Sequence, residues 1–214
     1  LLYGQNGNDT LYGGNNNDKL YGGNGADKVY GQAGNDSLYM DAGNDTLDGG
    51  SGTDWLYVTG STNSVVNLAK TTGQNTGYGT DIIKNIENAS GGTGVDKFYG
   101  TTGNNTLKGN NGNDLLYGQN GNDTLYGGNN NDRLYGGNGN DTLKGDAGND
   151  LLQGDAGKDT MFGGAGADTF VFRSTTHSSA SASGADIIRD FTRGVDKIDL
   201  HFIDASTKLS GNNA

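Results

Sequence analysis

A nine-residue unit with the pattern G-G-x-G-x-D-x-U-x, where U is apolar, occurs fifteen times along this chain of 214 residues. The clearest stretch, residues 118–144, reads GQNGNDTLY, GGNNNDRLY and GGNGNDTLK. A unit this short cannot bury its own apolar face, so successive copies must stack on one another to form a core. The period therefore restricts the chain to a solenoid built from many small and nearly identical steps.

Composition without the period would favour disorder, because only 31% of the residues are hydrophobic, 41 are glycine and the net charge is −11. A disordered chain, however, does not place an apolar residue in register at every ninth position. Place eight of the unit is apolar in all fifteen copies, and these positions form the expected core: Leu11, Leu20, Val29, Leu38, Leu47, Leu56, Phe98, Leu107, Leu116, Leu125, Leu134, Leu143, Leu152, Met161 and Phe170.

Each unit combines a turn with a very short strand. Places one to six are rich in Gly, Asn and Asp, which predicts a turn, and places seven to nine, such as residues 10–12, predict a strand with place eight pointing inward. Place four is glycine except at Asn16 and Asn130, and Asn is the residue that best tolerates left-handed backbone after glycine. Two units complete one coil, so residues 18 apart become neighbours. We predict an all-β fold, a right-handed parallel β-roll with one apolar layer between two thin sheets.

The units fall into two blocks separated by a stretch without the period. We expect a first roll block over residues 1–57, a non-repeat β connector over 58–90, a second roll block over 91–172 and a C-terminal β cap over 173–214. Segments 64–68 and 81–86 read as strands that continue the roll, and 186–200 reads as strand, turn and strand. Because residues 1–3 are the strand half of a unit, we expect the chain to be a fragment of a longer protein.

Place six carries the chemistry of the repeat. Stacked strands lie about 4.8 Å apart, so the place-six carboxylates should form columns on the two edges of the roll and repel one another unless neutralised. A donor set of carboxylate and carbonyl oxygens, in a chain without cysteine, favours Ca²⁺. Asn105 is the one exception to aspartate at this place, and the candidate metal ligands are Asp9, Asp18, Asp27, Asp36, Asp45, Asp54, Asp96, Asp114, Asp123, Asp132, Asp141, Asp150, Asp159 and Asp168.

Pairing each place-six residue with the one 18 residues further along gives four sites in the first block and seven in the second. The pair of Asn105 with Asp123 lacks one charge and should be weak or empty. About ten Ca²⁺ ions would more than cancel the net charge of −11, so we expect the metal-free chain to be expanded and the metal to drive folding. Aspartates that only cap backbone groups are common in isolated turns, but fourteen in register favour the metal.

The units resemble the RTX, or hemolysin-type, calcium-binding repeats of bacterial proteins exported by type I secretion, over roughly residues 1–172. Residues 163–205 (GGAGADTFVF…DIIRDFTRGVDKIDLHFIDA) resemble the C-terminal domain of serralysin-type metalloproteases, which is similar to tails of some secreted lipases and alginate-modifying enzymes. The resemblance implies that calcium bridges successive turns through the place-six aspartates and turn carbonyls. It also implies a secreted, extracellular or cell-surface location, the type I exporter as a partner, and a tail that caps the roll and carries a secretion signal, here expected to be truncated.

Other functions find little support in the residues. The acidity argues against a nucleic-acid partner, and no apolar run has membrane-spanning length. The chain lacks H-E-x-x-H and G-x-S-x-G, so we do not expect this fragment to be an enzyme, although the parent could be a secreted protease, lipase or polysaccharide-modifying enzyme. We interpret His177 and His201 as incidental.

Tyrosine recurs at the outward place nine, and same-sheet neighbours such as Tyr21, Tyr39 and Tyr57 should form a ladder. The favoured interpretation is cross-strand stabilisation of a thin sheet, and the other is a flat stacking platform for a polysaccharide. The leading functional hypothesis is a calcium-binding module that folds on extracellular calcium, supports type I export and stabilises an attached domain. The alternatives are a polysaccharide-binding accessory module of the alginate type, attached to a secreted enzyme, and an adhesin spacer segment.

Overall fold

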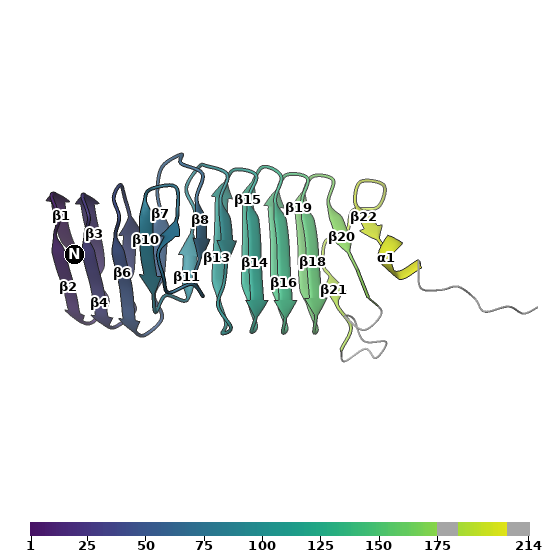
Figure 1. Ribbon diagram of the computed structural model, residues 1–214. Helices are drawn as coiled ribbons and strands as arrows, with labels where there is room; N and C mark the ends of the chain where they lie inside the picture. The colour runs from purple at the N-terminus through teal and green to yellow at the C-terminus, as the bar shows by residue number, and fades with distance from the viewer. Residues whose placement is uncertain (175–183, 205–214) are drawn as a thin grey trace, which may run out of the picture.

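The structure, a computed structural model, describes residues 1–174 and 184–204. The chain forms a parallel β-roll whose strands stand side by side along one long axis (Figure 1). One face is a ten-stranded sheet, and the opposite face consists of a five-stranded and a seven-stranded sheet. The predicted all-β parallel roll is therefore confirmed. Within the described ranges, no helix is long and apolar enough to cross a membrane.

The ten-stranded sheet contains, in spatial order, β1 (Leu2–Asn6), β3 (Lys19–Asn24), β5 (Ser37–Met40), β7 (Trp55–Val58), β11 (Asn88–Ser90), β13 (Thr106–Asn111), β15 (Thr124–Asn129), β17 (Thr142–Ala147), β19 (Thr160–Ala165) and β21 (Ile187–Ile188). The five-stranded sheet contains β2 (Thr10–Asn15), β4 (Lys28–Ala33), β6 (Thr46–Ser51), β10 (Thr80–Lys84) and β9 (Gln74–Asn75). The seven-stranded sheet contains β22 (Lys197–Asp199), β20 (Thr169–Val171), β18 (Leu151–Ala156), β16 (Arg133–Asn138), β14 (Leu115–Asn120), β12 (Lys97–Tyr99) and β8 (Val65–Asn67). A four-residue helix, α1 (His201–Asp204), follows β22.

Within each repeat block, neighbouring strands pair in the predicted register of 18 residues, as in Leu11 opposite Val29. Most strands of the repeat units are six residues long rather than the expected three, because the turn also stacks on the turn of the next coil and continues the ladder, with Gly14 opposite Gln32. The left-handed backbone predicted for the two exceptional asparagines is confirmed, with φ of 81° at Asn16 and 78° at Asn130.

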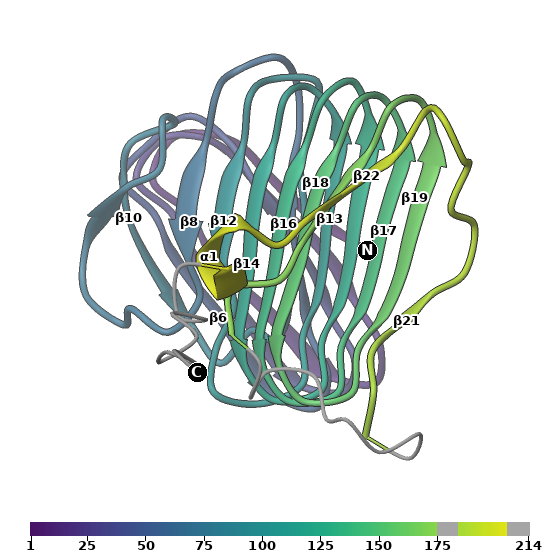
Figure 2. The same ribbon diagram turned by 90° about the vertical axis from the view of Figure 1, so that its right-hand side faces the viewer.

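The core is a single layer of side chains between the two faces. All fifteen place-eight residues are buried, the most exposed being Leu11 at 6%. Val66, Ile83 and Ala89 continue the same layer through the connector. Seen along the roll axis, the coils superpose into a flattened tube with the two sheet faces on opposite sides (Figure 2). So thin a layer leaves little apolar burial per residue, which makes other sources of stability necessary.

The connector does not interrupt the roll. On the ten-stranded face, β11 pairs with β7 before it and β13 after it, so this sheet runs unbroken through residues 58–90. On the other face, β10 pairs with β6 at an offset of 36 residues, and β9 lies antiparallel to β10. The Val65 N–H donates to the Thr76 carbonyl at 3.1 Å, which joins β8 to this group. The connector is therefore one enlarged coil, which extends beyond the outline of the others at β10 (Figure 2).

Beyond the repeats, the expected strand, turn and strand are present. β21 extends the ten-stranded sheet beside β19, and β22 extends the seven-stranded sheet beside β20. Residues 184–200 thus add one strand to each face at this end of the roll. Of the two histidines, His201 begins α1, and His177 lies outside the described residues.

Candidate metal centre

The place-six residues lie in columns along the two edges of the roll, where each turn leads into a strand. The long column precedes the strands of the ten-stranded sheet: Asp18, Asp36, Asp54, Glu87, Asn105, Asp123, Asp141, Asp159 and Asp186. The first short column lies at, or directly before, the start of strands of the five-stranded sheet: Asp9, Asp27, Asp45 and Asp81. The second short column precedes strands of the seven-stranded sheet: Asp96, Asp114, Asp132, Asp150, Asp168 and Asp196. All fourteen predicted ligands lie in these columns.

Within a column, one oxygen of each carboxylate holds the neighbouring coil. The Asp9 N–H donates to Oδ1 of Asp27 at 2.7 Å, and the Asp132 N–H donates to Oδ1 of Asp150 at 2.8 Å. The same bond repeats wherever two aspartates are 18 residues apart in a column. The capping role considered from the sequence is therefore real, but it accounts for only one of the two oxygens.

In most of these aspartates the second oxygen has no protein partner. Among the described residues, twelve place-six aspartates have a buried Oδ2 without a hydrogen bond: Asp9, Asp27, Asp36, Asp45, Asp54, Asp114, Asp123, Asp132, Asp141, Asp150, Asp159 and Asp168. A buried carboxylate oxygen without a donor or a counter-ion is strongly unfavourable. The regular repetition of this arrangement indicates that the fold provides the oxygens for a cation.

The place-one glycines keep space open beside these oxygens. A Cβ at Gly4 would lie 2.7 Å from Oδ2 of Asp9, and a Cβ at Gly22 would lie 2.6 Å from Oδ2 of Asp27. Neither glycine has a positive φ, so close approach rather than backbone conformation excludes a side chain here. A Cβ at Gly136 would lie 2.7 Å from the Gly154 carbonyl oxygen, which places a backbone oxygen beside the same space. Carboxylate and carbonyl oxygens together fit a hard cation such as Ca²⁺.

The electrostatics of the columns point the same way. Burial raises the pKa of Asp132 to about 8, with the charges of Asp114 and Asp150 in the same column adding to the effect. Burial likewise raises the pKa of Asp141 to about 7, against the lowering effect of the Asp123 N–H bonded to it. The protein alone therefore does not compensate these charges, and a divalent cation between neighbours would do so.

Sequence reasoning missed four members of the columns, because they fall outside the nine-residue period. Asp81 accepts the Asp45 N–H at 2.8 Å, and Glu87 accepts the Asp54 N–H at 2.8 Å. At the C-terminal end, Asp186 and Asp196 accept backbone N–H groups at 2.9 and 3.0 Å. The three aspartates could have been found from their local pattern, since each begins an Asp-x-Ile triplet at the start of a strand, which matches Asp-Thr-Leu of the repeat. Glu87 carries no such signal.

The enlarged coil differs from the others in satisfying its polar side chains internally. The Thr76 hydroxyl donates to Oδ2 of Asp81, and the Gly92 N–H donates to Oδ2 of Asp96 at 3.0 Å. The side-chain amide of Asn105 donates to the Glu87 carbonyl at 2.6 Å. The buried, unpartnered oxygens thus form two groups, one on each side of this coil. Asn105, whose site with Asp123 is expected from the sequence to be weak or empty, lies in the gap between these two groups.

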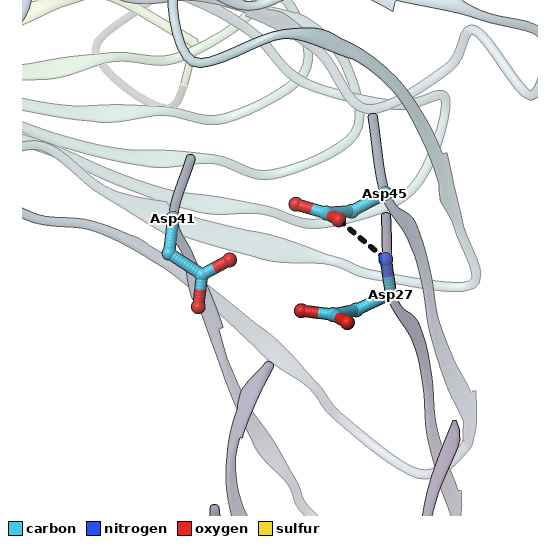
Figure 3. Close-up of side chains that lie close together, drawn as sticks. All are labelled: Asp27, Asp41 and Asp45. Carbon is cyan, nitrogen blue, oxygen red and sulfur yellow. Dashed lines mark hydrogen bonds between the residues drawn. The ribbon is translucent and has the colours of Figure 1, made fainter. Parts of the chain in front are cut away.

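One aspartate outside place six also reaches a column. Asp41, at place two of its unit, lies beside Asp27 and Asp45 with one oxygen of each of the three within 4.8 Å of the others (Figure 3). Burial raises the pKa of Asp41, and a bond from the Gly23 N–H to its Oδ2, 2.5 Å long, lowers it in part. Sequence reasoning did not single out this residue, because place two, which is glycine in the consensus, holds Gln, Asn, Thr or Asp in many of the units.

Comparison with known proteins agrees with the geometry. The model of the RTX calcium-binding nonapeptide repeat family matches residues 3–38, 41–63, 90–125, 109–143 and 135–170. None of the curated proteins compared with the chain matches it.

Proposed function

Because the chain belongs to the RTX calcium-binding nonapeptide repeat family, we propose that it is the calcium-responsive folding module of a secreted bacterial protein. The observation that carries the proposal is the set of twelve buried Oδ2 atoms without a donor. An RTX repeat solenoid is a calcium-binding structural fold rather than a catalytic one. The function of this module is therefore to couple its own folding to calcium.

The physical basis is the cost of the columns without metal. In the unfolded chain every carboxylate is hydrated, whereas in the roll the carboxylates are buried beside like charges about one strand spacing apart. The single apolar layer gives limited compensation. Calcium binding supplies the missing free energy only in the folded state, so the metal shifts the equilibrium toward the roll.

The proposed ligands are the fourteen place-six aspartates, with Asp81, Asp186 and Asp196 as additional members at the column ends. About ten ions would lie between successive carboxylates, with backbone carbonyls completing their oxygen shells. Weak sites, in the range typical of extracellular modules, would leave the chain unfolded at cytosolic calcium and folded outside the cell.

This calcium response suits type I export, in which an unfolded chain threads through the exporter and folds on meeting extracellular calcium. We assign residues 1–57 and 91–172 as roll blocks, 58–90 as their connector and 173–214 as a cap and secretion-related segment of serralysin type. β21 and β22 support the capping role, since they extend both faces. The folded roll would stabilise a domain attached to it, at an extracellular or cell-surface location.

Far-UV circular dichroism of the chain in calcium and in excess chelator tests the folding switch. We expect a β spectrum in millimolar calcium, a largely unfolded spectrum in chelator, and full recovery when calcium is added back. Magnesium at the same concentration is the matched control, because it dehydrates reluctantly and needs a smaller octahedral site. An unchanged β spectrum in chelator contradicts the proposal.

A second candidate function, polysaccharide binding, is favoured by the outer surface of the ten-stranded sheet. The predicted tyrosine ladder is present there, with ring centroids of Tyr21 and Tyr39 3.9 Å apart. Further along the same face, Lys108 lies 5.1 Å above the Trp55 ring and Lys144 lies 5.0 Å above the Tyr126 ring. Stacking rings and regularly spaced cations are groups that bind acidic sugar chains.

Affinity electrophoresis in calcium, with alginate or a neutral glycan in the gel, tests this second function. We expect retardation by alginate that weakens in a Lys108→Gln/Lys144→Gln double variant and persists in a Lys70→Gln control, since Lys70 is exposed in the connector. If no glycan retards the chain, the tyrosine ladders have the stabilising role favoured from the sequence. The function of the roll is then export, or that of an adhesin spacer.

A further inference from the structure

One unit of the first block has a distinctive turn. Met40 is the only residue at place one that is not glycine, and its side chain is 1% exposed in the core, where it pairs with Val58 of the next strand. β5 ends at Met40, and the following residue, Asp41, lacks the positive φ found at the same place in Gln32 (78°) and Asp146 (71°). The backbone therefore takes a different path through this turn.

The different path brings a third carboxylate to the first short column. Figure 3 shows the Asp41 carboxylate facing those of Asp27 and Asp45, which are linked by the Asp27 N–H donating to Oδ1 of Asp45 at 2.8 Å. Asp27 is 1% exposed and Asp45 is 3% exposed, and each has an Oδ2 without a donor. Among the described residues, this is the one place where three carboxylates meet at metal-binding separation.

We propose that Asp27, Asp41 and Asp45 form a three-carboxylate calcium site that binds more tightly than the two-carboxylate sites of the regular repeats. The inference rests on the proposed calcium function and deepens it. Calcium affinity in oxygen sites rises with the number of charged ligands, and three carboxylates leave the occupied site with a net negative charge. This site fills first as calcium rises and empties last as calcium is withdrawn.

The arrangement of Asp41 suits a ligand rather than a purely structural group. Its Oδ2 accepts a hydrogen bond from the Gly23 N–H, so the preceding coil holds the carboxylate in place. Without a cation, a third carboxylate beside two buried ones adds repulsion, and the bond from Gly23 offsets the cost of its burial and charge only in part. The Met40 side chain, buried in the apolar layer, fixes the turn that presents it. A trivalent cation should prefer this site even more strongly than calcium does, because its attraction to three carboxylates is greater.

Graded removal of calcium tests the proposal on the folded chain. The calcium-loaded protein is dialysed against chelators of increasing affinity, and the calcium retained per chain is measured by atomic absorption. We expect the unaltered chain to retain one ion under conditions that remove the others, and the Asp41→Asn variant to lose this ion at a chelator strength at least tenfold lower. Asp146→Asn is the matched control, since it removes the same charge at place two of a regular unit, and it should behave as the unaltered chain does.

Terbium provides a second measurement that needs no variant. Titration of the folded, calcium-loaded chain with Tb³⁺, followed by luminescence excited through the tyrosines and the tryptophan, should show one equivalent exchanged before the remainder. Loss of all ions together from the unaltered chain and from Asp41→Asn, or the absence of an early terbium step, overturns the three-carboxylate site. Absence of any bound calcium at saturation overturns the proposed function instead, so the two failures are distinguishable.

Discussion

The Asp132 N–H donates to Oδ1 of Asp150 at 2.8 Å, while Oδ2 of the same Asp150 is buried with no donor. The two oxygens of one carboxylate thus have separate tasks. One ties its coil to the preceding coil through the backbone, and the other is left for a cation. This division explains why aspartate, rather than asparagine or serine, occupies place six: an amide can accept the backbone bond, but it cannot provide a second anionic oxygen.

The division of tasks predicts different results for two substitutions of Asp132. Asp132→Asn keeps the acceptor for the Asp114 N–H and removes the charge, so calcium-induced folding should need severalfold more calcium. Asp132→Ala removes the acceptor as well, and should cost about a further 1–3 kcal/mol because the Asp114 N–H is then buried without a partner. Circular dichroism during calcium titration, followed by urea unfolding in saturating calcium, measures both effects.

Asp146→Asn, at place two, is the control for the charge change and should move the calcium midpoint less than Asp132→Asn does. Equal stabilities for Asp132→Asn and Asp132→Ala in saturating calcium would show that the Oδ1 bond contributes nothing measurable.

Acid should stabilise the metal-free roll. Burial raises the pKa of Asp132 to about 8 and that of Asp114 to about 7, whereas an aspartate in an unfolded chain has a pKa of about 3.9. Between these values the metal-free roll binds more protons than the unfolded chain, so its stability increases as the pH falls from about 8 toward about 4 and decreases as the pH rises through the folded pKa values.

Circular dichroism in excess chelator at pH 5 and pH 8 measures this effect, and more β structure is expected at pH 5. In calcium the dependence reverses, because protons compete with the metal for the same oxygens. A metal-free chain whose β content is the same at both pH values contradicts the assignment of these carboxylates as buried and uncompensated.

The period made the columns predictable, because every Asp-x-apolar triplet in phase had to fall at the same edge. The sequence was less informative where the phase broke. Asp81 pairs with Asp45 at an offset of 36 residues rather than 18, since β8 and β9 occupy part of the enlarged coil. The nine-residue pattern does not determine the length of the enlarged coil. That length depends on how three strands pack against one face.

Asp41 illustrates a second limit. Its neighbour Met40 replaces the glycine of place one, which the sequence shows. The effect of this replacement on the backbone of the turn cannot be read from the sequence. A buried methionine could have been accommodated by widening the coil. Instead the turn changes its backbone path and moves a carboxylate toward Asp27, which only the three-dimensional packing determines.

Gly136→Ala should impair calcium binding through lack of space. The added Cβ would overlap Oδ2 of Asp141 and lie 2.7 Å from the Gly154 carbonyl oxygen, while φ at this position is not positive. We expect a loss of about 1–3 kcal/mol in saturating calcium, as for overpacking at a tight site. Urea unfolding monitored by circular dichroism gives the value.

Gly103→Ala is the control, because the nearest atom to its Cβ would be the Thr101 hydroxyl at 3.8 Å. The control should change stability by less than about 1 kcal/mol. Similar losses for both variants would mean that glycine at place one is required for some property other than open space beside the carboxylate.

Asn105→Asp should restore a carboxylate to the gap in the long column. The substitution removes the bond from the Asn105 amide to the Glu87 carbonyl, 2.6 Å long, and sets a carboxylate oxygen against that carbonyl. The variant should therefore be less stable than the unaltered chain without calcium. In saturating calcium it should bind about one more ion per chain, because Asp123 lies in the next coil with an unpartnered Oδ2.

Atomic absorption after equilibrium dialysis counts the ions, and Asn104→Asp is the control, since it adds the same charge at an exposed neighbouring position. An unchanged ion count for Asn105→Asp would show that the surroundings of Glu87 and Thr101 exclude a cation even when the charge is present. A gain of one ion would instead show that the gap in the long column depends on a single side chain, that of residue 105.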